Sequence, residues 1–242
     1  MNGQRVYFSL HELLIMAALA ALGGVSSSAV SWVGGVVHTL TGLPGGLQSF
    51  AGIHVLWLVL AVGLVRKPGS ATVTGLLKGA VELLSGSRHG LVVVLVSGLA
   101  GLTVDGVWIL TGRRDRLVSY VLAGGLGAAS NLLVFKLFYS LPSHRAVTIA
   151  LAALTPVAFV SGAVLAGLLG WSLMDALRRA GVAGIQSPRE TGPPGGRAWV
   201  GAGLLAFAAA VIGTALFFAS APGKAEPPDH APPPESGTMS RP

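Results

Sequence analysis

The chain contains no cysteine and few charged residues. Its 242 residues include 9 acidic and 16 basic side chains, and charged residues make up 10% of the total. Because soluble domains carry about 25% charged residues, this composition excludes an ordinary soluble domain. The absence of cysteine excludes disulfides and thiolate metal sites.

The sequence also lacks the common catalytic and phosphate-binding patterns. It has no G-x-x-x-x-G-K-[ST] loop, so the chain is not expected to hydrolyse ATP itself. It has neither G-x-S-x-G nor H-E-x-x-H, the patterns of hydrolases and zinc peptidases. No pair stands at the His-x-x-Glu or His-x-His spacing of metal ligands. We therefore expect neither an enzyme nor a bound cofactor or metal.

What the sequence does have is apolar runs. Apolar residues make up 52% of the chain, and several runs approach the length of about 20 residues that spans a bilayer. The sequence therefore predicts an all-α polytopic membrane helix bundle. The expected segments are 10–30, 50–65, 71–84, 91–110, 117–139, 147–173 and 199–218.

These segments predict four regions along the chain. A six-helix membrane domain (1–183) is followed by a polar linker (184–197), an additional transmembrane helix (198–220) and a Pro-rich tail (221–242). The tail has too few apolar residues to pack and is expected to be disordered. The first run also allows a signal-peptide interpretation, because one Arg precedes it and small residues follow. A membrane helix is the favoured interpretation.

The basic residues predict the orientation in the membrane. Cytoplasmic loops carry an excess of Lys and Arg. With the N-terminus inside, the outer loops receive only Arg88 and Arg145, and the outer tail receives Lys224 and Arg241. We therefore predict a multi-pass plasma-membrane protein with a cytoplasmic N-terminus. The cytoplasmic bases would be Arg5, Arg66, Lys67, Arg113, Arg114, Arg116, Arg178, Arg179, Arg189 and Arg197.

The short segment 71–84 contains two opposite charges. Lys78 and Glu82 are four residues apart, so they share one helix face and can neutralise each other. Alternatively, Glu82 faces a polar cavity open to the outside and binds a cationic or hydrogen-bonding ligand. Ionisable groups within a membrane are functional candidates by default. The sequence leaves both interpretations open.

Other polar residues lie within the apolar segments. Asp105 can pair with Lys78 across helices or bind a ligand, and Asn131 can form an interhelical hydrogen bond or contact a ligand. His54 and His89 lie near the predicted outer ends of their segments, where together they could bind a ring or a metal, although the spacing does not favour a metal.

In the first segment, Ala17 and Ala21 form a small-xxx-small face. Such a face allows another helix to approach closely.

Several of these stretches resemble one family in the same order along residues 8–183. The similarity is to the YkoE-type substrate-binding (S) components of energy-coupling factor (ECF) vitamin transporters. The basic Pro-Gly turn and the Glu-x-x-x-Gly-Ser stretch are its most specific parts. The matching stretches are Gly52-Ile53, Arg66-Lys67-Pro68-Gly69, Val81-Glu82-Leu83-Leu84, Gly86-Ser87, Gly90, Gly101-Leu102, Asp105, Arg113-Arg114, "SGAVLAGLLG" and "DALRRAG".

The resemblance implies a function. S components of this type are six-helix bundles that bind a vitamin in an outward-facing cavity and pair with a transmembrane coupling subunit and two ATPases. Ala17 and Ala21 match positions that contact the coupling subunit. The YkoE type is associated with thiamine or its hydroxymethylpyrimidine moiety, which a carboxylate such as Glu82 suits.

The expected function is therefore vitamin capture in an ECF-type ABC importer. The alternatives are an S component for a different small molecule, or a non-transporting membrane scaffold with structurally paired charges. The candidate substrate-binding residues are Glu82, His89, His54, Asp105 and Asn131.

Overall fold

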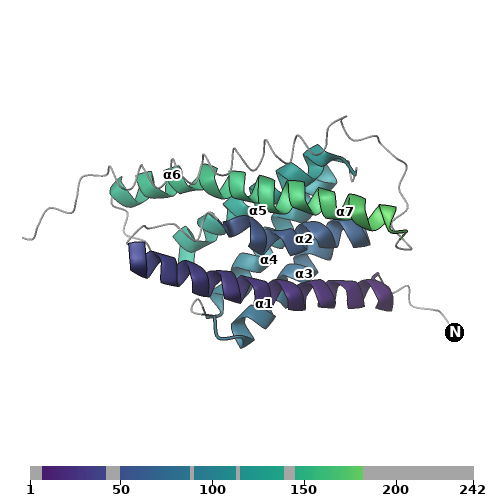
Figure 1. Ribbon diagram of the computed structural model, residues 1–242, viewed down its shortest axis with the longest axis horizontal. Helices are drawn as coiled ribbons and strands as arrows, with labels where there is room; N and C mark the ends of the chain where they lie inside the picture. Colours follow the sequence, from purple (N-terminus) through teal and green to yellow (C-terminus); the bar gives the residue numbers. More distant parts are fainter. Residues whose placement is uncertain (1–6, 42–49, 88–89, 113–114, 139–144, 182–242) are drawn as a thin grey trace, which may run out of the picture.

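The computed structural model describes residues 7–41, 50–87, 90–112, 115–138 and 145–181. His89, the linker at 184–197, the additional helix at 198–220 and the tail lie outside these residues. Every regular element in the described ranges is a helix (Figure 1). The helices are α1 (Leu10–Thr41), α2 (Ala51–Val65), α3 (Ser70–Leu84), α4 (Val92–Leu110), α5 (Leu117–Phe138), α6 (Arg145–Ser161), η2 (Gly162–Leu168) and α7 (Leu169–Arg179).

The prediction of an all-α membrane bundle is confirmed. Each of the first six predicted segments coincides with a helix, and α6, η2 and α7 follow one another without a break as the sixth. Two boundaries differ: α1 continues to Thr41 rather than residue 30, and the sixth segment continues to Arg179. The apolar residues after the Gly pair at 34–35 allow α1 to continue, which the expected end at 30 did not anticipate.

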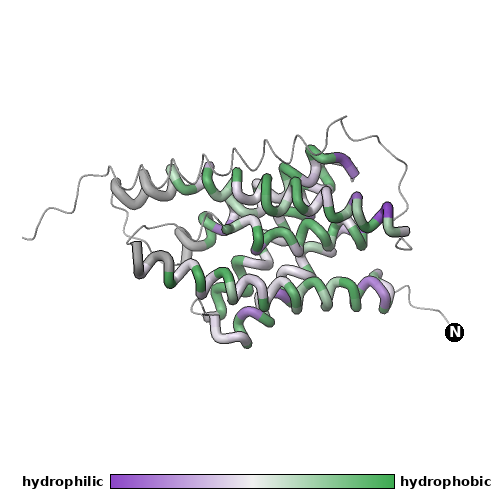
Figure 2. Tube along the Cα trace, viewed as in Figure 1, coloured by the Kyte–Doolittle hydropathy of each residue, from purple (hydrophilic) through white to green (hydrophobic). Residues whose placement is uncertain are grey.

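The helices differ in how well they could cross a membrane alone. Within the described part of the chain, three are long and apolar enough: Leu10–Val36, Val92–Leu110 and Ala153–Arg179. The apolar helices Ala51–Val65 and Leu117–Leu132 are shorter. Figure 2 shows apolar residues along most of the bundle, with the most strongly hydrophilic segments at the end where the chain begins. We call this the basic end; it holds the α2–α3 and α4–α5 turns and the end of α7.

Glycines bring α3 and α4 into backbone contact. A Cβ atom on Gly75 would lie 2.3 Å from the carbonyl oxygen of Ser97, and one on Gly101 would lie 2.4 Å from that of Ala71. A real side chain cannot occupy that space, so only glycine permits this approach. Close packing through small residues is characteristic of membrane helices. The two helices therefore form one tightly packed pair.

The π-helical segment η2 packs in the same way against α5. A Cβ on Gly124 would lie 2.4 Å from the carbonyl oxygen of Gly162, the first residue of η2. Just before η2, the Ser161 hydroxyl accepts a hydrogen bond of 3.0 Å from the backbone N–H of Gly52 in α2. The sixth segment is thus fixed to both α2 and α5.

Asp115 joins three parts of the basic end. Its carboxylate accepts hydrogen bonds from Arg66 (2.7 Å), from the hydroxyl of Tyr120 (2.8 Å) and from Arg178. The ends of α2 and α7 are thereby tied to the start of α5. Arg66 and Arg178, predicted only as orientation signals, are therefore also structural residues.

Candidate functional site

Lys78 and Glu82 form a buried ion pair on α3. The distance from Lys78 Nζ to Glu82 Oε2 is 3.0 Å, and the two side chains are 2% and 4% exposed. Lys78 also donates a hydrogen bond of 3.3 Å to Ser97 Oγ on α4. The predicted pairing is confirmed, and it lies within the protein rather than on a lipid-facing surface. A ligand contact for Glu82 stays a prediction.

Two glycines of α1 make room for this pair. A Cβ on Gly23 would lie 2.9 Å from Cγ of Trp57 and 3.2 Å from Cδ of Lys78. A Cβ on Gly24 would lie 3.2 Å from the backbone nitrogen of Glu82. The Trp57 ring on α2 and the Lys78 stem on α3 therefore meet against the same bare stretch of α1.

Several buried polar atoms have no hydrogen-bond partner among the described residues. They include Ser27 Oγ, Trp57 Nε1 and Asn131 Oδ1. Ser27 lies one turn after Gly23 on α1. Asn131 lies one turn after Gly127 on α5, and Gly127 faces α2 and α4. Because buried polar groups are nearly always hydrogen-bonded, such unsatisfied atoms need an explanation. A bound ligand that satisfies these atoms is one such explanation.

We call this set of residues, which comes from five helices, the polar layer. With a rise of about 1.5 Å per residue, Trp57 and Lys78 lie roughly 12 Å from the ends of their helices at the basic end. Glu82 lies roughly 18 Å and Asn131 roughly 21 Å from the same end. The set therefore extends from the middle of the bundle toward the end opposite the basic end. Its members are Ser27, Trp57, Lys78, Glu82, Ser97 and Asn131.

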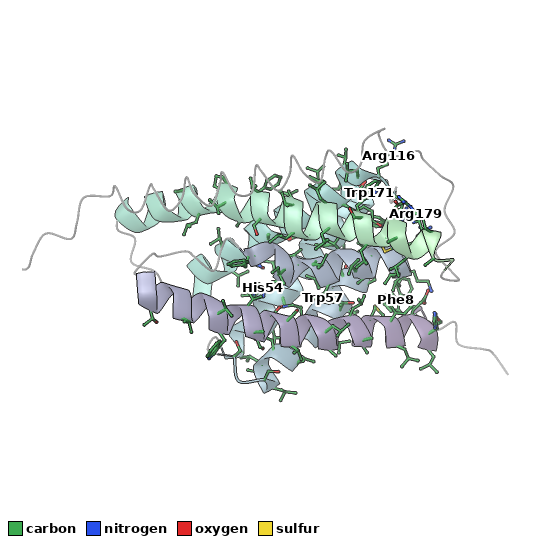
Figure 3. The ribbon with its side chains drawn as sticks, in the orientation of Figure 1. Phe8, His54, Trp57, Arg116, Trp171 and Arg179 are labelled. Carbon is green, nitrogen blue, oxygen red and sulfur yellow. The ribbon has the colours of Figure 1, made fainter. Side chains whose placement is uncertain are left out.

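His54 lies next to the polar layer. It is half-buried on α2, one turn before Trp57, and Figure 3 shows both beside α1 and away from Phe8, Arg116 and Arg179 at the basic end. His89 lies outside the described residues, so the predicted meeting of the two histidines stays a prediction.

Asp105 lies away from the polar layer. Its carboxylate accepts hydrogen bonds from the backbone N–H groups of Ala71 (3.3 Å) and Thr72 (2.8 Å), and from the Thr72 hydroxyl (2.6 Å). It therefore caps the N-terminus of α3, where a negative charge is favourable. The possible Lys78–Asp105 pair does not form, because α3 and α4 are antiparallel and Asp105 lies beside the first turn of α3. A ligand role for Asp105 stays a prediction.

Ala17 and Ala21 lie on the outside of the bundle. Both are exposed, whereas Met16, Ala20 and Gly23 on the opposite face of α1 are buried. This small-residue face is therefore available to another helix.

Sequence reasoning missed Ser27, Trp57 and Ser97. Trp57 lies inside an unbroken apolar run, and a single serine in a membrane helix carries no spacing signal. The adjacent pair Gly23-Gly24 was the available indication that another helix passes close to α1.

Comparison with known proteins agrees with this arrangement. Residues 11–130 match the family described as "ABC-type cobalt transport system, permease component". The chain is 27% identical over 175 residues to the "Putative HMP/thiamine permease protein YkoE" of Bacillus subtilis (strain 168), covering 72% of this chain and 87% of the relative. A crystal structure of an S-component of an ECF transporter superposes with a TM-score of 0.65 at 26% identity, covering 72% and 88% of the two chains.

In sequence and in fold, the chain is similar to the YkoE-like S components of ECF transporters, over nearly the whole length of each relative. S components of this kind work in transport with a membrane coupling subunit and ATPases, and they bind a vitamin-like substrate. The chain is accordingly a multi-pass membrane protein of the ABC-type transport class.

Proposed function

We propose that this S component captures thiamine or a hydroxymethylpyrimidine-like nutrient in the polar layer and passes it to a coupling subunit driven by partner ATPases. The observation that carries the proposal is the presence, in one helix bundle, of unsatisfied buried polar atoms (Ser27 Oγ, Trp57 Nε1 and Asn131 Oδ1) together with a buried carboxylate. The name of the Bacillus subtilis relative, an HMP/thiamine permease, supports this substrate class.

The chemistry of the polar layer suits an aminopyrimidine. The exocyclic amine of such a ring donates hydrogen bonds, and Glu82 has acceptor positions beyond the one used by Lys78. The ring nitrogens accept hydrogen bonds, which Trp57 Nε1 and Ser27 can donate. Asn131 is part of the layer and His54 lies next to it; both are proposed substrate-binding residues.

A direct binding measurement tests the proposal. Isothermal titration of the purified full chain with thiamine and with 4-amino-5-hydroxymethyl-2-methylpyrimidine should show saturable binding of at least one of them at one site per chain. Native mass spectrometry should then detect a ligand of that mass. A vitamin without an aminopyrimidine, such as biotin, serves as the control. Absence of binding by both aminopyrimidines contradicts the proposed substrate.

We further propose that the basic end faces the cytoplasm. Arg66, Lys67 and Arg116 lie in turns at this end, and Arg178 and Arg179 lie in the last turn of α7. Positively charged loops favour that side. A cysteine introduced at Gly112, in the α4–α5 turn, should react with a membrane-impermeant maleimide only after cell lysis, whereas one at Gly86, in the α3–α4 turn, should react in intact cells. The reverse labelling contradicts this orientation.

One observation favours the scaffold alternative. Lys78 and Glu82 already satisfy each other, as a purely structural pair would. The two functions are separated by the Glu82 substitutions described in the Discussion.

A further inference from the structure

We infer that Lys78 is a specificity residue that makes the polar layer select an electrically neutral aminopyrimidine over a cationic one. This inference rests on the proposed function and decides between its two substrates. Thiamine carries a permanently positive thiazolium ring, whereas hydroxymethylpyrimidine is largely neutral near neutral pH. The two ligands share the pyrimidine and differ in the charge that the site must accommodate.

The Lys78–Glu82 pair gives the polar layer no net charge. Lys78 Nζ lies 3.0 Å from Glu82 Oε2, and both side chains are almost fully buried. The other parts of the layer in contact with this pair come from Gly23, Trp57 and Ser97, which carry no charge. The single carboxylate is therefore already neutralised by a cation that belongs to the protein.

A cationic ligand is consequently disfavoured in either of two positions. If it replaces Lys78 beside Glu82, the ammonium loses its partner while still buried, which is strongly unfavourable. If Lys78 stays, the ligand adds a second positive charge beside a neutral pair, with no carboxylate left to offset its desolvation. Of the remaining described acids, Asp105 binds the start of α3. The others form ion pairs at the basic end: Glu12 with Lys67, Asp115 with Arg66 and Arg178, and Asp175 with Arg179.

A neutral ring meets neither obstacle. Lys78 has three N–H donors, of which the structure uses two, for Glu82 and Ser97. The third can donate to a ring nitrogen while the ion pair stays intact. Trp57 Nε1 and Ser27 Oγ, both without partners, can satisfy the remaining polar atoms. The same lysine that opposes a cation therefore provides a hydrogen bond to a neutral pyrimidine.

The test compares two probes on four proteins. Titration calorimetry of the full chain with 4-amino-5-hydroxymethyl-2-methylpyrimidine and with thiamine should show at least a tenfold preference for the pyrimidine. Lys78→Met, which keeps the length and removes the charge, frees Glu82 and should reduce the preference about tenfold through a gain in affinity for thiamine. Lys67→Met, in the half-exposed turn before α3, is the matched control and should keep the original ratio.

A double variant distinguishes a change in specificity from a loss of folding in Lys78→Met. Lys78→Met with Glu82→Gln removes both charges, so thiamine should gain nothing over the pyrimidine. Equal affinities for the two probes in the unmodified chain, or a ratio unchanged by Lys78→Met, overturns the role of Lys78 while leaving the proposed function in place. Binding of neither probe to the unmodified chain overturns both.

Discussion

Glu82→Gln is expected to lower the affinity for an aminopyrimidine by about tenfold to a hundredfold. The substitution keeps the size of the side chain and removes its charge. Hydrogen bonds to charged groups are worth about 1.5–3 kcal/mol and are roughly twice as strong as neutral ones. With about 1.4 kcal/mol per decade of affinity, the loss falls in that range. Titration calorimetry of the purified variant measures it.

The same substitution should also reduce stability, because it leaves the ammonium of Lys78 buried without a carboxylate. Breaking a buried pair costs about 3–5 kcal/mol, whereas replacing both partners with uncharged residues is often neutral. Lys78→Met with Glu82→Gln should therefore recover thermal stability while pyrimidine affinity stays low. Recovered stability with no ligand bound by any variant, including the unmodified chain, would support the scaffold alternative. Lost stability with unchanged affinity would make Glu82 a structural partner only.

Ala17→Trp and Ala21→Trp are each expected to abolish co-purification with a coupling subunit. Both alanines lie on the exposed face of α1, where a large ring prevents a neighbouring helix from reaching the backbone. Neither side chain lies in the polar layer, so ligand affinity and thermal stability should not change. Affinity purification from cells that express the whole transporter measures the complex.

Leu102→Trp provides the control for these substitutions. Leu102 is exposed on α4, at 58% of its surface, so this variant also places a Trp on the outside of the bundle. Complex formation should survive in Leu102→Trp and fail in the α1 variants. An intact complex in both α1 variants contradicts the proposed coupling face.

The sequence predicted the helices well and the polar contacts only in part. Helix limits follow from apolar runs and from turns such as Arg66–Gly69, which are local signals. The Lys78–Glu82 pair was predictable for the same reason, since four residues separate the partners on one helix. The contacts of Asp105 with Thr72 and of Asp115 with Arg178 join residues 33 and 63 positions apart. Such contacts depend on how helices pack, which periodicity does not encode.

The cap that Asp105 places on α3 limits how the bundle can open. Its bonds of 2.6–3.3 Å to Ala71 and Thr72 would break if α3 slid along α4 by a single residue, about 1.5 Å. The glycine contacts between these helices resist tilting as well. The helices α3 and α4 therefore move as one rigid body that carries Lys78, Glu82 and Ser97 together. A ligand that enters from the α1 side has to displace α1, and Val81 of α3 packs into the space that Gly24 leaves on that helix.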